Sequence, residues 1–92
     1  MEKKKRVRIE VIHDLLSIIR SHNNSIKPTP LLRYSNLSSQ RFMLYFNELM
    51  EKDFVREIKD SRGRKFITLT DKGFRYLDKY KAIKEFIESF DL

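Results

Sequence analysis

The sequence predicts a mainly α-helical fold with one small β-hairpin, an α+β domain, and three observations lead to this prediction. Apolar residues recur at helical spacing in three long stretches, residues 7–21, 36–54 and 71–92. Between the second and third stretches lie two short runs rich in Val, Ile, Phe and Thr, separated by a loop that contains glycine. The 92 residues, 40% of them hydrophobic, suffice for one core and therefore for one domain.

The charge of the chain is strongly positive and unevenly distributed. Twenty Lys and Arg residues against 13 Asp and Glu give a net charge of +7 and a pI near 9.8. Residues 1–35 carry +5, residues 36–70 carry +2, and residues 71–92 are neutral. A positive field of this size favours polyanions, above all nucleic acid. The first two-thirds of the chain are therefore expected to face an anion.

Composition also argues against several kinds of site. The sequence has no cysteine, which excludes disulfides and thiolate metal sites. His13 and His22 are too few for a zinc site. No apolar run approaches the roughly 20 residues needed to span a bilayer. We therefore expect an intracellular, cytoplasmic protein that uses no metal, no cofactor and no small-molecule ligand, and that does not enter a membrane.

Residues 1–6 are expected to form a basic arm, and residues 7–21 the first helix. The arm contains four consecutive bases, and it is either a frayed, solvated terminus or a flexible contact to DNA phosphates. One face of the helix is apolar and is formed by Ile9, Ile12, Leu15, Leu16 and Ile19. Val11 and Ile18 widen this face, which predicts packing against both its own domain and a second subunit.

Residues 21–30 are dense in loop formers, and a short second helix is expected to follow them. A turn is predicted at residues 23–24. Thr29 can cap a helix whose first residue is Pro30, where a missing N–H costs nothing. This helix is predicted to stop at residues 35–36.

The stretch of residues 36–54 predicts the helix around which the domain is organised. Ser38 can cap it. One side has apolar residues at the i, i+3, i+4, i+7 spacing, namely Phe42, Tyr45, Phe46, Leu49 and Met50. The opposite side carries Gln40, Arg41, Leu44, Asn47 and Glu48. Such a helix is suited to a DNA major groove, although any amphipathic surface helix shares the pattern.

Residues 54–58 and 65–70 are expected to be the two strands of a hairpin. Gly63 can take the positive φ that its short loop needs. Three cations cluster at the tip, either because hairpin tips are wet or because they bind phosphate; they are Arg62, Arg64 and Lys65. A short helix, a turn and a longer helix make a helix-turn-helix. A basic hairpin directly after them is the wing of a winged helix.

The last helix, capped by Thr70 or Asp71, is expected to outlast the domain. Phe74 and Leu77 can turn back onto the core. The remaining apolar residues form a heptad seam of about two repeats, with Tyr76, Tyr80, Ile83, Ile87 and Phe90. We expect this seam to be the interface of a homodimer with a short coiled coil; the alternative is a helix folded back along the first helix of its own chain.

The expected organisation is therefore a basic arm at residues 1–6, a winged-helix domain at residues 7–75, and a C-terminal dimerisation helix at residues 76–92.

Two motifs add a family resemblance that covers about residues 8–80. They are Thr29-x-Leu31-Leu32-x-x-Ser35-Asn36-Leu37-Ser38 and Leu69-Thr70-x-Lys72-Gly73. With them, the chain resembles the small archaeal winged-helix proteins, which include the dimeric chromatin-associated "ten-a" kind and predicted transcriptional regulators. The second motif is shared by many winged helices and indicates the fold rather than the partner.

The resemblance implies that the helix after the first motif recognises DNA and that the C-terminal helix forms an antiparallel dimer rod. It implies DNA contacts at the wing, residues 62–65, and at Ser38, Ser39, Gln40 and Arg41. Two positions depart from the family pattern: Ser39 stands where an aromatic residue is frequent, and Asp53 stands where glycine is usual. Asp53 can still adopt the left-handed conformation of a helix end. The final helix is also shorter than a full rod.

The leading hypothesis is a dimeric winged-helix protein that binds double-stranded DNA, with or without sequence specificity, as a transcriptional regulator or a nucleoid-associated chromatin protein. Gln40, Arg41 and Asn47, with Leu44 among them, are the candidates for base edges, since Gln and Asn match adenine and Arg matches guanine. Phosphates are expected to be held by the arm and by Lys27, Thr29, Arg33, Arg62, Arg64 and Lys65.

Two alternatives stay open. The winged helix can instead be a protein-interaction module without DNA binding, in which Met43 and Leu44 form an apolar docking patch. RNA binding is favoured by charge alone, but recognition of single strands needs exposed aromatic residues, and most aromatics here fall on faces assigned to the core or the seam. An enzyme is not expected, because the sequence pairs no nucleophile with a base and has no glycine-rich loop to cradle a nucleotide.

Overall fold

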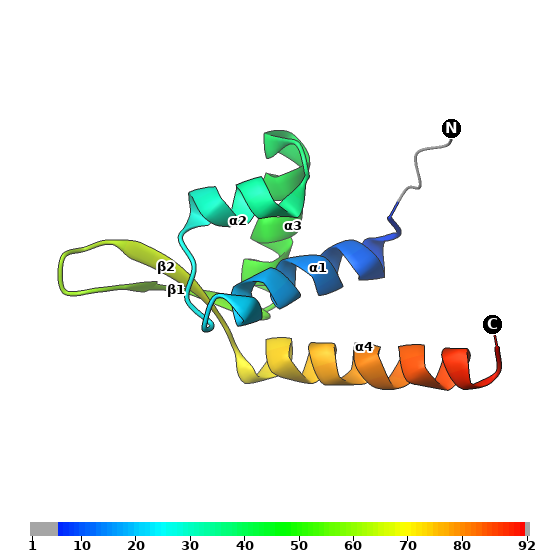
Figure 1. Ribbon diagram of the computed structural model, residues 1–92. Coiled ribbons are helices and arrows are strands. Elements are labelled where there is room, and N and C mark those ends of the chain that lie inside the picture. Colours follow the sequence, from blue (N-terminus) through cyan, green and yellow to red (C-terminus); the bar gives the residue numbers. More distant parts are fainter. Residues whose placement is uncertain (1–5, 92) are drawn as a thin grey trace.

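The computed structural model describes residues 6–91, which form helices at one end of the chain, a hairpin near its middle and a long helix after it (Figure 1). In chain order the elements are α1 Arg8–Ser21, α2 Pro28–Ser35, α3 Ser39–Glu51, β1 Val55–Lys59, β2 Lys65–Leu69 and α4 Asp71–Ser89. This order confirms the predicted mainly α-helical fold with one hairpin.

Helix α1 runs through the centre of the molecule and packs against α2, β2 and α4. Its buried face agrees with the prediction at Ile12, Leu15, Leu16 and Ile19, and Val11, which was predicted to widen this face, is buried with them. Val11 is fully buried, whereas Ile9 is 57% exposed and does not belong to the core. The prediction for Ile9 was wrong because α1 is covered on more than one side, which brings Val11 rather than Ile9 inward. The excess apolar width of α1 is thus used within its own domain.

Helix α2 begins two residues earlier than expected. Its first residue is Pro28, and Lys27 precedes it in an extended conformation without a side-chain capping bond, so Thr29 lies inside the first turn instead of capping it. Both prolines can be accommodated because the first N–H groups of a helix have no intrahelical partner. The end is as predicted: Asn36 takes a left-handed conformation with φ of 58°.

The core is a single cluster of apolar side chains contributed by all the helices and both strands of residues 6–91. Its members are Val11, Ile12, Leu15, Leu16, Ile19, Ile26, Leu31, Phe42, Leu49, Val55, Ile67, Leu69 and Leu77. Beside it, the hydroxyl of the buried Ser35 donates to the Leu32 carbonyl at 2.6 Å and accepts from the Leu37 N–H at 3.2 Å. These bonds fix the turn between α2 and α3.

Strands β1 and β2 pair in antiparallel register, with Val55 opposite Leu69 and Lys59 opposite Lys65. On its other edge, β2 pairs with the single residue Ile26 through two backbone hydrogen bonds to Ile67, of 2.7 and 3.2 Å. The predicted turn at Asn23 and Asn24 leads into this bridge, both residues having positive φ. The Asn24 side chain also accepts from the Leu69 N–H at 2.7 Å. The hairpin is thereby attached to the segment before α2.

The junction of α3, β2 and α4 explains the Leu69-Thr70-x-Lys72-Gly73 motif. The Thr70 hydroxyl caps α4 by accepting from the Gly73 N–H at 3.2 Å, and it donates to the Asp53 carbonyl at 2.6 Å. A Cβ atom at Gly73 would lie 2.4 Å from the Phe54 carbonyl oxygen, so only glycine fits. The Lys72 ammonium donates to the Lys52 carbonyl at 2.8 Å. The motif therefore joins the end of α3 to the start of α4.

Helix α4 runs antiparallel to α1, and its two halves have different environments (Figure 1). In the first half Leu77 is buried, the Tyr76 hydroxyl donates to the Ile9 carbonyl at 2.7 Å, and the Tyr80 ring stacks on His13 at 4.0 Å. Burial raises the pKa of the Tyr76 hydroxyl. From residue 81 onward every described residue of the helix is exposed. The alternative of a helix folded back on α1 thus holds for the first half alone.

Candidate nucleic-acid interface

Helix α3 is anchored on one side and open on the other. The Ser38 hydroxyl caps it by accepting from the Arg41 N–H at 3.2 Å, as predicted. Phe42 and Leu49 are buried, and Tyr45, Phe46 and Met50 pack against the core at partial burial. The side predicted to face DNA remains exposed at Ser39, Gln40, Arg41, Leu44 and Asn47.

No part of α4 packs over this open side, because α4 packs on α1 and β2. In the view of Figure 1, α1 lies between α3 and α4. Among the described residues, α4 therefore leaves the outward side of α3 uncovered. A helix surface that reads base edges is expected to be polar. This surface is partly apolar, since Leu44 is 69% and Met43 47% exposed.

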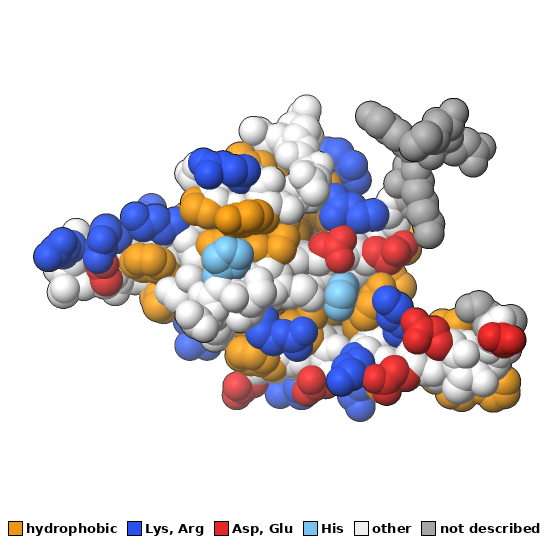
Figure 2. Space-filling model, in the orientation of Figure 1, with side chains coloured by type: hydrophobic (Ala, Val, Ile, Leu, Met, Phe, Trp, Pro, Cys, Tyr) orange, Lys and Arg blue, Asp and Glu red, His pale blue; other side chains and the backbone are white. Residues whose placement is uncertain are grey.

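The tip of the wing is held in shape by Asp60, a residue for which the sequence analysis assigned no role. Its carboxylate accepts from the backbone N–H groups of Arg62 and Arg64, each at 2.9 Å, and from the Arg64 side chain at 2.6 Å. The backbone hydrogen bond from Arg64, together with its guanidinium, lowers the pKa of Asp60. Gly63 has the predicted positive φ, 76°. Lys and Arg side chains lie along the hairpin out to its tip (Figure 2).

The three predicted wing cations differ in their contacts. Arg64 pairs with Asp60, and the Lys65 ammonium lies 3.8 Å from the Glu57 carboxylate. The Arg62 side chain has no ion pair within residues 6–91. All three are exposed. Arg62 is therefore the wing-tip cation whose charge is most available to a phosphate.

The start of α2 approaches the wing at Phe66. The Lys27 ammonium and the Arg64 guanidinium each lie 6.0 Å from the centre of the Phe66 ring. Thr29 and Arg33, the other predicted phosphate ligands on α2, are exposed. The structure thus brings Lys27 and the wing, which are far apart in the sequence, into one basic surface.

Arg41, in contrast, lies at a groove between α3 and α1. The groove also contains Arg8, the first residue of α1, which pairs with Glu48. Sequence reasoning missed Arg8 because its partner lies 40 positions away, and no local pattern marks the pair. The role of Asp60 could have been predicted from the sequence, because an Asp side chain commonly accepts from the backbone N–H two residues later in a turn.

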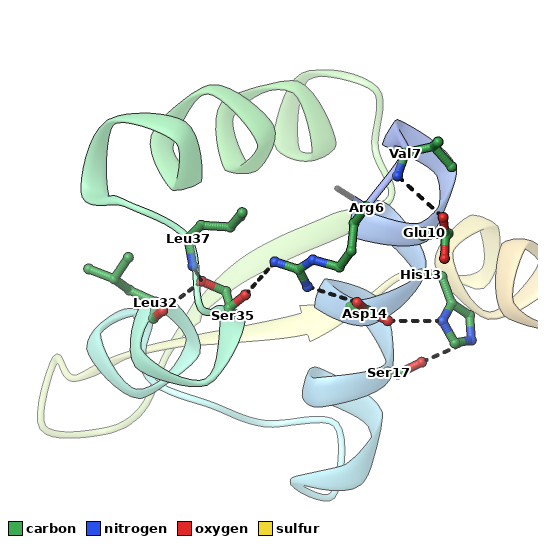
Figure 3. Close-up of polar contacts among 9 residues, drawn as sticks. All are labelled: Arg6, Val7, Glu10, His13, Asp14, Ser17, Leu32, Ser35 and Leu37. Carbon is green, nitrogen blue, oxygen red and sulfur yellow. Dashed lines mark hydrogen bonds and ion pairs between the residues drawn. The ribbon is translucent and has the colours of Figure 1, made fainter. Parts of the chain in front are cut away.

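Most of the predicted basic arm, residues 1–5, lies outside the described residues. Arg6 is described, and it is engaged within the domain (Figure 3). Its guanidinium donates to Asp14 at 2.8 Å and to the Ser35 carbonyl, at the end of α2, at 2.9 Å. Asp14 in turn contacts His13 at 3.4 Å.

The residues predicted for the dimer interface fall into two groups. Tyr76 and Tyr80 are half-buried against α1, whereas Ile83, Ile87 and Phe90 are exposed by 43–62%. Phe86, which is outside the heptad seam, is 64% exposed and its ring lies 5.1 Å from that of Phe90. The free apolar surface is therefore shorter and wider than the predicted seam.

Within residues 6–91, no cluster of His, Asp or Glu side chains is arranged to hold a metal ion. None of the helices in the described part of the chain combines the length and the apolar character needed to cross a membrane.

Comparisons with known proteins agree on the fold. The family described as winged helix-turn-helix matches residues 5–88. The structure is similar to that of F93 from STIV, described as a winged-helix DNA-binding protein, with a TM-score of 0.71, 17% identity, and coverage of 88% of this chain and 92% of F93. It is also similar to Sso10a-2, a DNA-binding protein from Sulfolobus solfataricus, with a TM-score of 0.67, 18% identity, and coverage of 94% and 90%. No curated protein sequence matches this chain significantly.

Proposed function

This chain belongs to the winged helix-turn-helix family, and from that premise we propose that it binds double-stranded DNA, to regulate transcription or to organise the chromosome. The protein would therefore be associated with DNA in the cell and would carry out no catalytic step. Two proteins with similar structures are described as DNA-binding, which supports it.

The observation that carries the proposal is the open side of α3, flanked by cations from two other elements. An α-helix fits the major groove, where Gln40 and Asn47 would meet base edges. The wing and the start of α2 would then lie on the sugar–phosphate backbone, with Lys27, Thr29, Arg33, Arg62, Arg64 and Lys65 as its ligands. The phosphate contacts supply affinity and position the helix, whereas the side-chain amides of Gln40 and Asn47 supply any sequence preference.

The salt dependence of binding to a labelled duplex tests this proposal. Each phosphate contact contributes a slope of about −0.9 in log K against log salt concentration, so the slope is expected to be steep. Arg62→Ala should lower its magnitude by about 0.9 and weaken binding to all sequences alike. Arg75→Ala on α4 is the matched control, because Arg75 is equally exposed but lies outside the proposed interface. A complex insensitive to salt, or equal effects of the two variants, would contradict the proposal.

Comparison of a random with a selected duplex in the same titration separates the two biological roles. A regulator binds its own site typically 10³-fold or more tightly than random DNA, whereas a chromosome-organising protein shows little difference. Gln40→Ala should reduce that ratio if the protein is a regulator, and leave binding to random DNA almost unchanged.

We further propose that the protein is a homodimer assembled through the second half of α4. Its exposed apolar surface consists of Ile83, Phe86, Ile87 and Phe90, and it continues across a groove to Ile9 of α1. Residues 71–92 have no net charge while the whole chain carries +7, so two copies can approach through α4 with little electrostatic repulsion. Light scattering in solution, measured over a range of concentrations, tests this; a monomer at every concentration would contradict it.

A second function is favoured by one observation, the exposure of Leu44 and Met43 at the centre of the open side of α3. An apolar pair there is also suited to docking another protein. Leu44→Arg distinguishes the two functions. It should impair DNA binding if α3 enters a groove, and should abolish a protein complex while leaving DNA affinity intact if α3 is a docking helix.

A further inference from the structure

The groove between α1 and α3 contains a cluster of charges, of which only Arg41 was a candidate DNA contact, to a base edge, in the sequence. It has a volume of about 440 Å³ and is lined by Arg8, Arg41, Leu44, Tyr45 and Glu48. Arg41, Tyr45 and Glu48 follow one another at helical spacing along one side of α3, and Arg8 reaches them from the first turn of α1.

Glu48 is the carboxylate that the described part of the chain contributes to this groove, and it contacts two cations. It accepts from the Arg8 guanidinium and lies 3.3 Å from the Lys52 ammonium, one turn further along α3. The hydrogen bond from Arg8 and, less strongly, that from Lys52 lower the pKa of Glu48, and the same contact raises the pKa of Arg8. Among the lining residues, Arg8 and Arg41 are cationic and Glu48 is anionic, so the lining carries a net positive charge.

The Arg8 side chain retains the capacity to bind a further anion. Its side chain is 54% exposed, and its one ion-pair partner within residues 6–91, Glu48, occupies one of the two terminal nitrogens. A guanidinium carries five N–H donors in a planar fork, so it can donate to Glu48 and to a phosphate at the same time. An exposed ion pair of this kind is weak in water, so it does not sequester the charge.

The groove opens onto the proposed DNA-facing side of α3. Leu44 belongs to both surfaces: it lines the groove and is the most exposed large apolar residue of α3. A duplex that accommodates α3 in its major groove would place one sugar–phosphate strand along each flank of the helix. The wing and the start of α2 hold cations for the backbone elsewhere, and the groove supplies them on the flank next to α1.

We propose that this groove is a phosphate-binding site for the DNA strand beside α3, with Arg8 and Arg41 as its ligands and Glu48 limiting its strength. The inference rests on the proposed DNA binding and adds α1, which the sequence analysis left out, to the interface. Because phosphates are the same in every sequence, the site contributes affinity without sequence preference.

The test measures binding of a labelled random duplex between 50 and 200 mM salt. Arg8→Ala should lower the magnitude of the salt slope by about 0.9, which makes the affinity loss about 3.5-fold larger at 50 than at 200 mM salt. Arg20→Ala, at the other end of α1 and also exposed, is the matched control and should leave the slope unchanged. Arg41→Ala should act as Arg8→Ala does.

Because Arg8→Ala also leaves Glu48 without its partner, the same substitution is repeated in a Glu48→Gln background. Glu48→Gln alone should tighten binding, since it removes a negative charge from the site. If Arg8 holds a phosphate, the double variant still has a slope about 0.9 smaller than Glu48→Gln. If the double variant equals Glu48→Gln in slope and affinity, Arg8 only neutralises the carboxylate, and the inference is wrong.

Failure of this inference and failure of the proposed function give different results. If the unmodified chain binds with a steep salt slope that Arg62→Ala reduces and Arg8→Ala does not, DNA binding stands and the groove site falls. If the unmodified chain shows no salt-dependent binding, both fall.

Discussion

Helix α3 and the second half of α4 are both exposed helical surfaces of one small domain, but their side chains differ in kind. On α3 the open side presents Gln40 and Asn47, with cations from α1, α2 and the wing around it. On α4 the exposed side presents Ile83 and Phe86 among balanced charges, and residues 71–92 have no net charge. The polar helix fits a polyanion and the apolar helix fits a second apolar surface, so exposure alone does not identify a partner.

A second contrast lies within α4 itself. The first half is a core helix of the domain, fixed by Leu77 and by the Tyr76 hydroxyl, whereas the second half contacts little of its own chain. One continuous helix therefore has a buried half followed by an exposed half. The following experiments separate these regions, beginning with the largest expected effect.

Leu77→Ala should destabilise the domain by about 2–5 kcal/mol, because it removes a fully buried side chain and leaves a cavity between α4 and the core. Urea unfolding followed by circular dichroism measures this cost. Arg75→Ala, two residues earlier and exposed, is the control and should remain within about 0.5 kcal/mol of the parent chain. Equal costs would show that α4 is not part of the core.

Phe86→Glu should disrupt the dimer while leaving the domain folded. A central aromatic residue of an interface typically contributes at least about 2 kcal/mol, which corresponds to a roughly 30-fold rise in the dimer dissociation constant. Analytical ultracentrifugation measures that constant. Lys81→Gln lowers the net charge by one unit, as Phe86→Glu does, at a position about 140° further round α4, and should have little effect. A dimer unaffected by Phe86→Glu would assign the interface to another surface.

The two hydroxyl caps should differ in their contribution to stability. Ser38→Ala removes one hydrogen bond at the exposed start of α3 and should cost about 1 kcal/mol. Thr70→Ala should cost about 2 kcal/mol, since the buried Thr70 hydroxyl also donates to backbone carbonyls of residues 53 and 54. Thermal unfolding of the two variants provides the comparison, and a Thr70 variant no less stable than the Ser38 variant would contradict the role assigned to the junction.

The smallest expected effect is confined to the wing tip. Because hydrogen bonds to its carboxylate lower the pKa of Asp60, the folded form has the lower pKa. The ionised carboxylate holds the wing tip in an ordered conformation through these hydrogen bonds. This order is fully present above the ordinary aspartate pKa, and it is lost as the pH falls through the lowered pKa of Asp60, below about pH 4. Amide chemical shifts of Arg62 and Arg64, recorded by NMR during an acid titration, should report this loss. Asp60→Asn should remove the titration from both amides, and its persistence would exclude Asp60 as the cause.

The features that could be predicted from the sequence are those set by neighbouring residues. Ser38 and Thr70 cap their helices, Gly63 has positive φ, and Asp53 takes the left-handed conformation, with φ of 63°. Each depends on a hydroxyl or a backbone preference that acts within a few positions. The hairpin and the order of the helices follow from periodicity in the same way.

One feature was missed because of a local ambiguity, and the others depend on contacts between distant segments. Two prolines two positions apart both satisfy the rule for a first helical residue, so the start of α2 at Pro28 could not be distinguished from one at Pro30. The bridge between Ile26 and Ile67 involves a single residue on one side and produces no alternating pattern. The inward face of α1, with Val11 rather than Ile9, is decided by how many elements surround the helix. The pairing of Arg8 with Glu48 likewise requires the fold.

Thr70 alone separates β2 from α4, so the wing continues into a long helix without a flexible joint. A helix of 19 residues is about 28 Å long, and a tilt of about 10° at its base displaces its far end by about 5 Å. The packing of the first half of α4 on α1 opposes such a tilt, so the junction at Gly73 fixes where Phe86 and Phe90 lie relative to the wing.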